Sequence, residues 1–460
     1  MPKCHQGAGD SLTCTGLPPK LISAPATPAS NRSIPNGMAH FDRKKPTPLP
    51  AHVTSLTLTG PWPGVRWQQQ VEASEGRLFA VPKLLESALA LAPEVIADRR
   101  AIHHRPELAY RETETAALVA GRLTQLGLRV RPGVAVTGVV GLIEGASPGK
   151  TVLLRADMDA LPIQEDSHHE YASANLGVMH ACGHDAHTAI LLGVAKLLSQ
   201  PRRQLVGNVK LMFQPAEEGG AGALRMIEEG VLEDPGVDAA FMLHVSALHE
   251  VGPVATKAGP ALAGTNLFAI TINGRGGHAS TPHVTVDPVV VAAQVVNAVQ
   301  TLVSREVNPS KPVVITLGSI RAGTAANIIP DQAVIQGTVR AYSDDAMSML
   351  ARRLEEMVTG IAGTFRADAQ IEYSMHYPAT VNDPEMAGLL ARSSRRVLGD
   401  NAVLTADPIF AGEDFSFILQ RVPGAMLHLG VRNSEWADER PPHTARFDLD
   451  EGCAPLGWRA

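Results

Sequence analysis

Residues 179–187, with the sequence MHACGHDAH, concentrate side chains that bind metal ions. They place one thiol, three imidazoles and one carboxylate within nine residues, separated by small residues that let the backbone fold tightly. Cysteine thiolate and histidine nitrogen together suit zinc, manganese, cobalt or nickel. A helix N-terminus with polar caps would explain the same stretch equally well. A metal site therefore requires further ligands from elsewhere in the chain.

Glu217 and Glu218 are adjacent carboxylates that follow an apolar segment, residues 208–213, and precede two glycines. Neighbouring side chains at the end of a strand point in different directions, so one carboxylate can bind an ion while the other accepts a proton from water. Such a general base contributes roughly 10²–10⁴-fold to the rate. An exposed acidic turn is the alternative. We predict a hydrolytic metal centre with Cys182, His184 and Glu218 as ligands and Glu217 as the base.

Five further polar side chains are candidates for the same centre. His244 follows another apolar segment and His443 lies in the last segment, so both can supply an imidazole ligand. Asp159 could orient a ligand imidazole by accepting its second N–H, or it could be an ordinary turn residue. Asp185 could orient the site or cap the helix that follows it. His278 follows three glycines within five residues and could stabilise the oxyanion of the reaction, unless it is a solvated loop residue.

Three short apolar segments are predicted to be the strands that position these groups. They cover residues 151–156, 208–213 and 239–243, and helical patterns over 189–198 and 221–229 separate them. Acidic or imidazole side chains follow each strand. Because ligands bind outside the carboxyl ends of the strands in open α/β sheets, these groups should converge at one edge of the sheet. We therefore predict a doubly wound α/β catalytic domain with a mixed sheet.

A different unit is predicted over residues 261–370. Its pattern indicates a four-stranded antiparallel sheet with two helices on one face, inserted into the catalytic domain as a lid. The catalytic domain would then consist of residues 86–260 and 371–460. The expected strands cover 267–272, 313–317, 333–339 and 370–374, and the expected helices cover 289–303 and 345–362.

Residues 1–85 contain 12 of the 34 prolines and show no persistent helical or strand period, which predicts a disordered N-terminal tail. Order is expected to begin near Pro93, at the first position of a helix.

Composition excludes several classes of function. The formal net charge of -6 offers no basic footprint for nucleic acid or an anionic membrane. No apolar run approaches the ~20 residues needed to span a bilayer. The four cysteines are few and far apart, which argues against a disulfide scaffold and predicts a reducing compartment such as the cytoplasm.

Together these segments resemble the M20 metallopeptidase family, specifically its amidohydrolase branch. That branch includes hippurate hydrolases, N-acyl-amino-acid hydrolases of the aminoacylase type and auxin-conjugate hydrolases. The resemblance runs from about Pro93 to the C-terminus, with many motifs in the right order. The motifs are RRAIH at 99–103, LRADMDALP at 154–162, MHACGHD at 179–185, FQPAEEG at 213–219, GGHA at 276–279, NIIPD at 327–331, GTVR at 337–340 and EDFS at 413–416.

The resemblance implies a centre of two divalent ions per subunit, manganese or zinc, with cobalt and nickel as further candidates. It implies that His278 reaches the active site of a second subunit in a homodimer formed through the lid. It also implies that Asn327 and Arg340 hold the carboxylate or carbonyl of the substrate. The implied ligands are Cys182, His184, Glu218, His244 and His443, with Glu217 as the catalytic base.

Metal-dependent hydrolysis of the amide bond in an N-acyl amino acid, of the N-acetyl or N-benzoyl type, is the leading expectation. A dipeptidase or carboxypeptidase with the same centre is the close alternative. A non-catalytic protein with a structural metal is the third. Structural zinc sites are closed by four Cys and His ligands, whereas this chain offers mixed ligands and a spare carboxylate, which disfavours the third reading.

Overall fold

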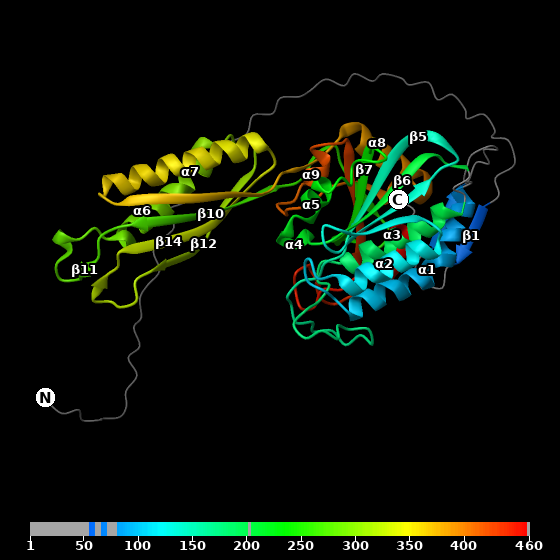
Figure 1. Cartoon of the computed structure of the whole chain (residues 1–460), viewed down its shortest axis with the longest axis horizontal. Helices are drawn as coiled ribbons and strands as arrows, with labels where there is room; N and C mark the ends of the chain where they lie inside the picture. The colour runs from blue at the N-terminus through cyan, green and yellow to red at the C-terminus, as the bar shows by residue number, and fades with distance from the viewer. Residues whose placement is uncertain (1–54, 60–65, 71–80, 201–203, 458–460) are drawn as a thin grey trace, which may run out of the picture. The chain divides into compact units, whose positions relative to one another are not determined.

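The computed structural model in Figure 1 describes residues 55–59, 66–70, 81–200 and 204–457. Most of the tail predicted over residues 1–85 lies outside these ranges. Two of its segments, β1 (Ser55–Thr59) and β2 (Arg66–Gln70), form an antiparallel pair. Leucine alternates with serine and threonine in β1, which is the pattern of a strand. The prediction that most of residues 1–85 are disordered stays a prediction.

Helix α1 (Val81–His104) begins twelve positions before Pro93 and contains that proline in its interior. The prediction that Pro93 is the first helical residue is therefore wrong. A proline inside a helix removes one backbone hydrogen bond and costs about 3 kcal/mol. Packing on both sides of the proline offsets this cost, because Ala88, Ala92 and Val95 are buried in one apolar cluster.

A mixed sheet of eight strands forms the larger unit (Figure 1). Its central strands β7, β5 and β6 are parallel, as predicted, and antiparallel strands complete the side beyond β6. In spatial order the strands are β17 (Val403–Thr405), β8 (Val254–Thr256), β18 (Gly424–Arg432), β7 (Ala239–Glu250), β5 (Ser147–Asp157), β6 (Val206–Gln214), β4 (Gly138–Glu144) and β3 (Arg129–Val134).

Helices cover both faces of this sheet, which makes it doubly wound. On one face, Leu211 and Phe213 of β6 lie in a cluster with residues of α2 and α3. On the other face, Met212 lies in a cluster with Ala223 and Met226 of α5 and with residues of α9. Because side chains alternate between two covered faces, the consecutive residues Leu211, Met212 and Phe213 of β6 are all apolar. The helices are α2 (Thr113–Gln125) and α3 (His184–Ser199), and α5 (Gly222–Glu228) and α9 (Ser416–Leu419).

The order of the strands creates a switch point beside β5. The chain passes from β5 to β6 on one side and then returns to β7 on the other side of β5. The pairing of β5 with β7 ends at Arg155 and Met242. The predicted strand over 239–243 continues to Glu250, so His244 lies inside β7 rather than after it. His244 is nevertheless beyond the part of β7 that β5 covers, at the edge where ligands bind in such sheets.

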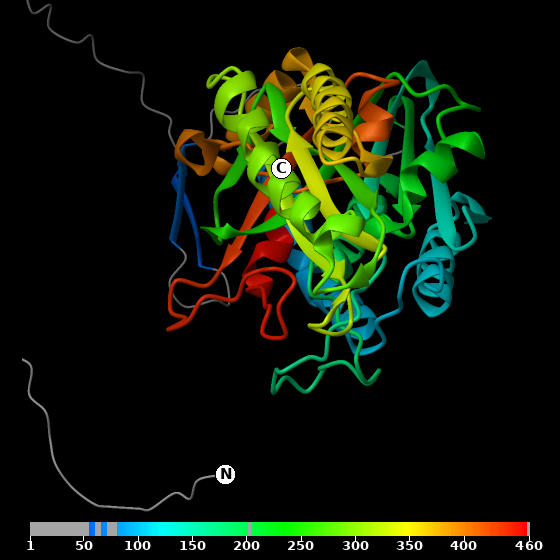
Figure 2. The same cartoon turned by 90° about the vertical axis from the view of Figure 1, so that its left-hand side faces the viewer.

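A second sheet of four antiparallel strands lies between β8 and β17 in the sequence, and it matches the predicted arrangement. Its two helices pack on the same face, where Ile270 and Ile335 of the sheet share a core with Val295 and Leu354. Figure 2 shows the two helices side by side. The strands are β12 (Val313–Ala322), β14 (Gln332–Ala341), β10 (Gly264–Asn273) and β15 (Asp368–Tyr377), and the helices are α6 (Pro288–Thr301) and α7 (Asp344–Thr364).

The remaining larger helix, α8 (Pro384–Leu398), packs on β18 of the large sheet. Short elements complete the fold, among them α4 (Glu217–Gly220) and α10 (Ala454–Gly457). Among the residues that the structure describes, no helix is both long enough and apolar enough to cross a membrane.

Candidate metal centre

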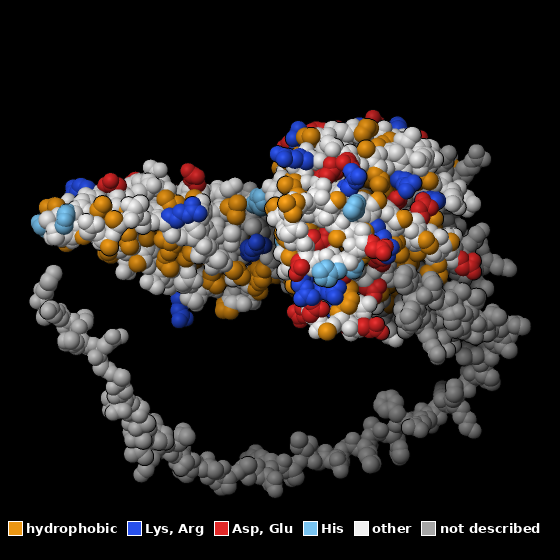
Figure 3. Space-filling view, turned by 90° about the horizontal axis from the view of Figure 1, so that it is seen from below, with side chains coloured by type: hydrophobic (Ala, Val, Ile, Leu, Met, Phe, Trp, Pro, Cys, Tyr) orange, Lys and Arg blue, Asp and Glu red, His pale blue; other side chains and the backbone are white. Residues whose placement is uncertain are grey.

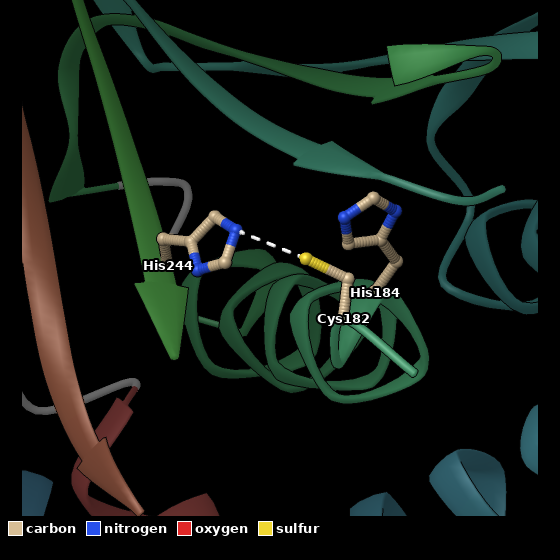
Figure 4. A group of neighbouring side chains, drawn as sticks. All are labelled: Cys182, His184 and His244. Carbon is tan, nitrogen blue, oxygen red and sulfur yellow. Dashed lines mark hydrogen bonds between the residues drawn. The ribbon is translucent and has the colours of Figure 1, made fainter. Parts of the chain in front are cut away.

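The turn into α3 places Cys182 and His184 beside β7. Gly183 between them adopts φ of 86°, a left-handed conformation that favours glycine. A Cβ atom at this position would lie 2.5 Å from Cγ2 of Val245, which leaves no room for a side chain. The turn brings Sγ of Cys182 to 3.7 Å from Nε2 of His244, as Figure 4 shows.

All five predicted ligands and the predicted base belong to overlapping groups whose donor atoms lie within 4.8 Å of one another. Any two of the three groups that together hold these residues have one residue in common, which is Cys182, His184 or Glu218. The groups therefore form one continuous cluster. Overlapping groups of this kind can hold two neighbouring ions. Three of the five groups hold these residues: Cys182, His184 and His244; Cys182, Glu218 and His443; and His184, Glu217 and Glu218. The other two groups extend from His184 to Asp157 and His187 and from Glu217 to Glu413 and Asp414.

His184 shows that the cluster fits a metal ion. Its side chain is fully buried, and Nδ1 lies 3.2 Å from Oδ1 of Asp159. Its Nε2 has no hydrogen-bond partner among the described residues. A buried imidazole nitrogen without a partner is costly unless a ligand binds it, and a divalent metal is the ligand that this donor set suits.

His443 comes from the last segment of the chain, and its backbone fixes its position. Its N–H donates to the carbonyl oxygen of Ala181 at 2.8 Å. Its Nε2 lies 3.0 Å from Oε1 of Glu218. Hydrogen bonds with Cys182 and Glu218 raise the pKa of His443 to about 10. His443 therefore lies in the cluster with Cys182 and Glu218, and its role as a ligand stays a prediction.

Electrostatics favours the metal-binding form of Cys182. Burial alone would raise the pKa of the Cys182 thiol, but the positive charge of His184 and hydrogen bonds from His244 and His443 lower it to about 6. The thiolate is the form that binds metals. Burial opposes a charge on His244, but its contact with Cys182 raises its pKa to about 9. A divalent ion would replace the protons that these imidazoles otherwise carry.

Glu217 differs from its neighbour Glu218. It is buried, and desolvation together with the nearby Glu413 and Asp414 raises its pKa well above the usual value of a carboxyl. Contact with His443 lowers the pKa of Glu218 although burial opposes this. The two adjacent carboxyls thus differ in the way that a proton-transferring base and a metal ligand require.

Asp159 and Asp185 are the two residues that the sequence predicted to orient the ligands. Asp159 also accepts the backbone N–H of Glu218 at 2.9 Å. Asp185 does not cap α3, because its N-cap is Gly183 without a side-chain bond. Instead Asp185 accepts hydrogen bonds from Nε of Arg99 and from Nδ1 of His103, both at 2.9 Å. The prediction of a capping role is wrong, whereas an orienting role for Asp185 stays a prediction.

Sequence reasoning missed a buried ionic network behind the cluster. Arg155 is fully buried on β5 and pairs with Asp157, Glu413 and Asp414 at 2.5–3.0 Å. Asp157 in turn lies 2.6 Å from Nδ1 of His187. The indication in the sequence was an arginine inside an otherwise apolar strand. Glu413 and Asp414 were not recognisable as partners because they lie 258 and 259 residues away from Arg155 along the chain.

Three residues of the four-stranded unit were predicted to serve the active site, and they lie in two different places. Arg340 lines the cavity described below and donates to the carbonyl oxygen of Phe410 at 2.6 Å. His278 and Asn327 are both exposed. They lie beside each other, because β11 (Gly277–His278) pairs with β13 (Ile328–Ile329). Within this one chain, neither of them belongs to the described ligand cluster.

A cavity of about 660 Å³ opens onto the cluster. Its wall includes the metal-ligand candidates, Glu217, Arg340 and several apolar side chains. Tyr377, which the sequence did not single out, donates its hydroxyl to the carbonyl oxygen of Glu217 and accepts the N–H of Gly219 at 2.9 Å. His428 also lines the cavity, and burial lowers its pKa to about 3. The cavity can therefore hold a small organic substrate next to the cluster.

Comparison with known proteins identifies the class. The model of peptidase family M20/M25/M40 matches residues 153–454, more than half of the chain. The chain belongs to this family, which confirms the predicted resemblance and fold class. It is therefore a metal-dependent hydrolase of amide bonds, as its hydrolase relatives and its ligand cluster indicate.

Two relatives and one solved structure illustrate the range of the family. The chain is 42% identical over 381 residues to Thermostable carboxypeptidase 2 of Saccharolobus solfataricus, covering 82% of this chain and 96% of that protein. It is 42% identical over 363 residues to IAA-amino acid hydrolase ILR1-like 4 of Arabidopsis thaliana, covering 78% and 82%. The structure of YXEP from Bacillus subtilis, a dinuclear metal-binding peptidase of the M20 family, superposes with a TM-score of 0.71 at 33% identity, covering 80% and 96%.

Proposed function

We propose that the protein hydrolyses the amide bond of N-acyl amino acids, with acyl groups of the acetyl or benzoyl type, and releases a carboxylic acid and a free amino acid. The observation that carries the proposal is the position of Glu217. Its buried carboxyl adjoins the ligand cluster and lines the cavity in which Arg340 offers a cation for a substrate carboxylate. An amide with a nearby carboxylate matches this combination.

The residues divide the chemistry as follows. Divalent ions held by Cys182, His184, Glu218, His244 and His443 would polarise the amide carbonyl and lower the pKa of water. Glu217 accepts the proton of the attacking water and later delivers it to the leaving nitrogen. Two ions fit because the ligand groups overlap, and the mixed sulfur, nitrogen and oxygen donors suit manganese or zinc, with cobalt and nickel as further candidates.

We also propose that the protein works as a homodimer formed through the four-stranded unit, in which His278 and Asn327 of one copy serve the cavity of the other. His278 is exposed in this chain, which suits a residue that acts on a second copy. Figure 3 shows apolar side chains gathered on this unit. Val284, Ile320 and Ile328 are 55%, 52% and 53% exposed there, as expected for a surface that a partner covers. Sedimentation measurements on the wild type and on an Ile320→Asp variant test this.

A cytoplasmic location is proposed on the basis of the buried thiols. Cys182 and Cys453 are both free, which suits a reducing compartment. Fractionation of cells that produce the full chain tests the location.

Carboxypeptidase activity, which removes the last amino acid of a peptide, is the second candidate function. It is considered because one relative with 42% identity is named a carboxypeptidase. A substrate panel separates the two. N-benzoylglycine, N-acetylmethionine, a dipeptide and a carboxypeptidase substrate are assayed with wild type and Glu217→Gln, with and without a chelator. Preference for the first two substrates, lost on chelation and in Glu217→Gln, supports the proposal. Inactivity on both acyl amino acids in the presence of metal would refute it.

A further inference from the structure

Tyr377 is the last residue of β15 in the four-stranded unit, and its side chain contacts the turn that carries Glu217. Its single hydroxyl bonds three backbone groups at this turn. The hydroxyl donates to the carbonyl oxygen of Glu217 at 2.5 Å, and it accepts the N–H of Gly219 at 2.9 Å and that of Ala221 at 3.3 Å. A phenol hydroxyl offers one donor and two acceptor sites, so these three bonds use its full capacity.

The backbone around this turn adopts conformations that residues other than glycine rarely take. Ala216 precedes α4 and Ala221 follows it, with φ of 54° and 51° in the left-handed region. Such conformations are costly, and they persist only where surrounding contacts impose them, most often at functional sites. The shape of the turn therefore depends on its hydrogen-bond partners, and the direction of the Glu217 side chain depends on the turn.

The adjacent carboxylates Glu217 and Glu218 have different supports. Asp159 of the catalytic domain accepts the backbone N–H of Glu218 at 2.9 Å. The hydroxyl of Tyr377 binds the carbonyl oxygen of Glu217. Glu218 keeps its bond to Asp159 when the hydroxyl is removed. Loss of the hydroxyl should therefore disturb the proposed base more than the proposed ligand.

The ring of Tyr377 is itself fixed by its surroundings. It is buried, stacks on the ring of His376 with centroids 4.2 Å apart, and meets the ring of Phe417 edge-on at 6.1 Å. Burial raises the pKa of the hydroxyl, so the group keeps its proton and can donate it to the carbonyl oxygen. A buried donor with a fixed ring can define the position of the backbone that it binds.

We propose that Tyr377 is a positioning residue that aims the carboxyl of Glu217 for proton transfer by binding the backbone of its turn. The inference rests on the proposed function, in which Glu217 is the general base. A base must lie within hydrogen-bond distance of the water that it activates, and a misplacement of about 1 Å can cost roughly 10²-fold in rate. Because Tyr377 belongs to β15, the position of the base then depends on a residue of the four-stranded unit.

A double-mutant cycle between Tyr377 and Glu217 tests the inference. Tyr377→Phe removes the hydroxyl and keeps the ring, and kinetics are measured with N-benzoylglycine or N-acetylmethionine, whichever the wild type hydrolyses faster. With Glu217 present, we expect Tyr377→Phe to lower kcat about 10–100-fold and to leave KM within about twofold. In the Glu217→Gln background, we expect Tyr377→Phe to lower the residual kcat less than about twofold, because the group through which it acts is already gone.

Tyr373→Phe is the matched control. Tyr373 lies on the same strand, and its hydroxyl accepts a hydrogen bond from Asn266 of β10 at 3.1 Å rather than from α4. This variant should leave kcat within about twofold in both backgrounds. A loss of kcat that reflects unfolded protein would be the same with and without Glu217, so the cycle separates a positioning role from a purely structural one. Metal analysis of each variant shows whether Tyr377→Phe keeps its metal, as we expect.

The possible failures are distinguishable. No loss of kcat in Tyr377→Phe, or an equal loss in both backgrounds, overturns the role of Tyr377 and leaves the proposed function standing. A Glu217→Gln variant with the kcat of the wild type overturns the assignment of the base and the inference together, as does a wild type that hydrolyses no acyl amino acid. A loss of metal that accounts for the lower kcat of Tyr377→Phe would show that the hydroxyl supports Glu218 instead, and it would overturn the inference.

Discussion

His184 and Asp159 form a buried contact in which Nδ1 of the imidazole lies 3.2 Å from Oδ1 of the carboxylate. An ionised carboxylate accepts hydrogen bonds, so Nδ1 of His184 donates and Nε2 is directed to the ligand cluster. The second oxygen of Asp159 accepts the backbone N–H of Glu218 at 2.9 Å. One carboxylate thus orients two predicted ligands from α3 and α4.

Asp159→Ala should weaken metal binding about 10–100-fold, because residues that orient a metal ligand contribute affinity of this size. Titration of the metal-free protein in competition with a fluorescent chelator measures the change. Asp98→Ala is the matched control, because Asp98 is also buried but pairs with Arg122 outside the cluster. Equal metal affinity in the wild type and Asp159→Ala would contradict the orienting role.

Glu217→Gln and Glu218→Gln should have different consequences although the residues are adjacent. Removal of the base in Glu217→Gln should lower kcat roughly 10²–10⁴-fold with little change in metal content. Loss of a ligand in Glu218→Gln should lower metal content and activity together. Metal analysis of the purified variants, combined with kinetics at saturating metal, separates the two roles. The assignment fails if Glu217→Gln loses metal and Glu218→Gln keeps it.

Alkylation of the metal-free protein should reveal the state of Cys182. Its pKa is lowered to about 6, so its thiolate fraction rises with pH and is nearly complete above about pH 7. Burial raises the pKa of Cys453, so this thiol should stay unreactive over the same range. Mass spectrometry after iodoacetamide treatment between pH 5 and 8 follows both sites, with Cys453→Ala as the control. Bound metal should protect Cys182, and equal labelling with and without metal would argue against its role as a ligand.

Arg155→Met should destabilise the protein by about 3–5 kcal/mol, because it leaves buried carboxylates without their cation. Arg155 pairs with three of them, and its side chain is fully buried. Chemical denaturation measures the free energy of unfolding. Arg352→Met is the control, because the ion pair of Arg352 with Glu356 is exposed and such pairs contribute little to stability. A loss in Arg155→Met that matches the control would show that the network is not needed for stability.

The predicted ligands were recognisable because residue type carries their chemistry. A thiol and imidazoles in one short stretch, and two carboxylates after an apolar strand, indicate metal hydrolysis before any fold is known. The strands β5 and β6 were equally predictable, because a strand that is buried on both faces requires a run of apolar residues. The end of β7 could not be predicted from the sequence, because pairing with β18 extends this strand past His244 to Glu250.

The helix around Pro93 and the role of Asp185 were misjudged for a related reason. Local rules place proline at a helix start and aspartate at a cap. In the structure, packing of α1 against the apolar cluster extends the helix past the proline, and Arg99 and His103 bind Asp185. Contacts between distant segments outweighed the local preference.

Residue types and their order along the chain were sufficient for the family, for the fold class and for the strands that precede the candidate ligands. Tertiary structure decided which charges are paired, as for Arg155 and Glu413, which lie 258 residues apart in the sequence. It also decided which buried polar atoms are left without a hydrogen-bond partner among the described residues, as for Nε2 of His184. Whether a polar atom is paired depends on its neighbours in space, and folding brings those neighbours from segments that no local pattern connects.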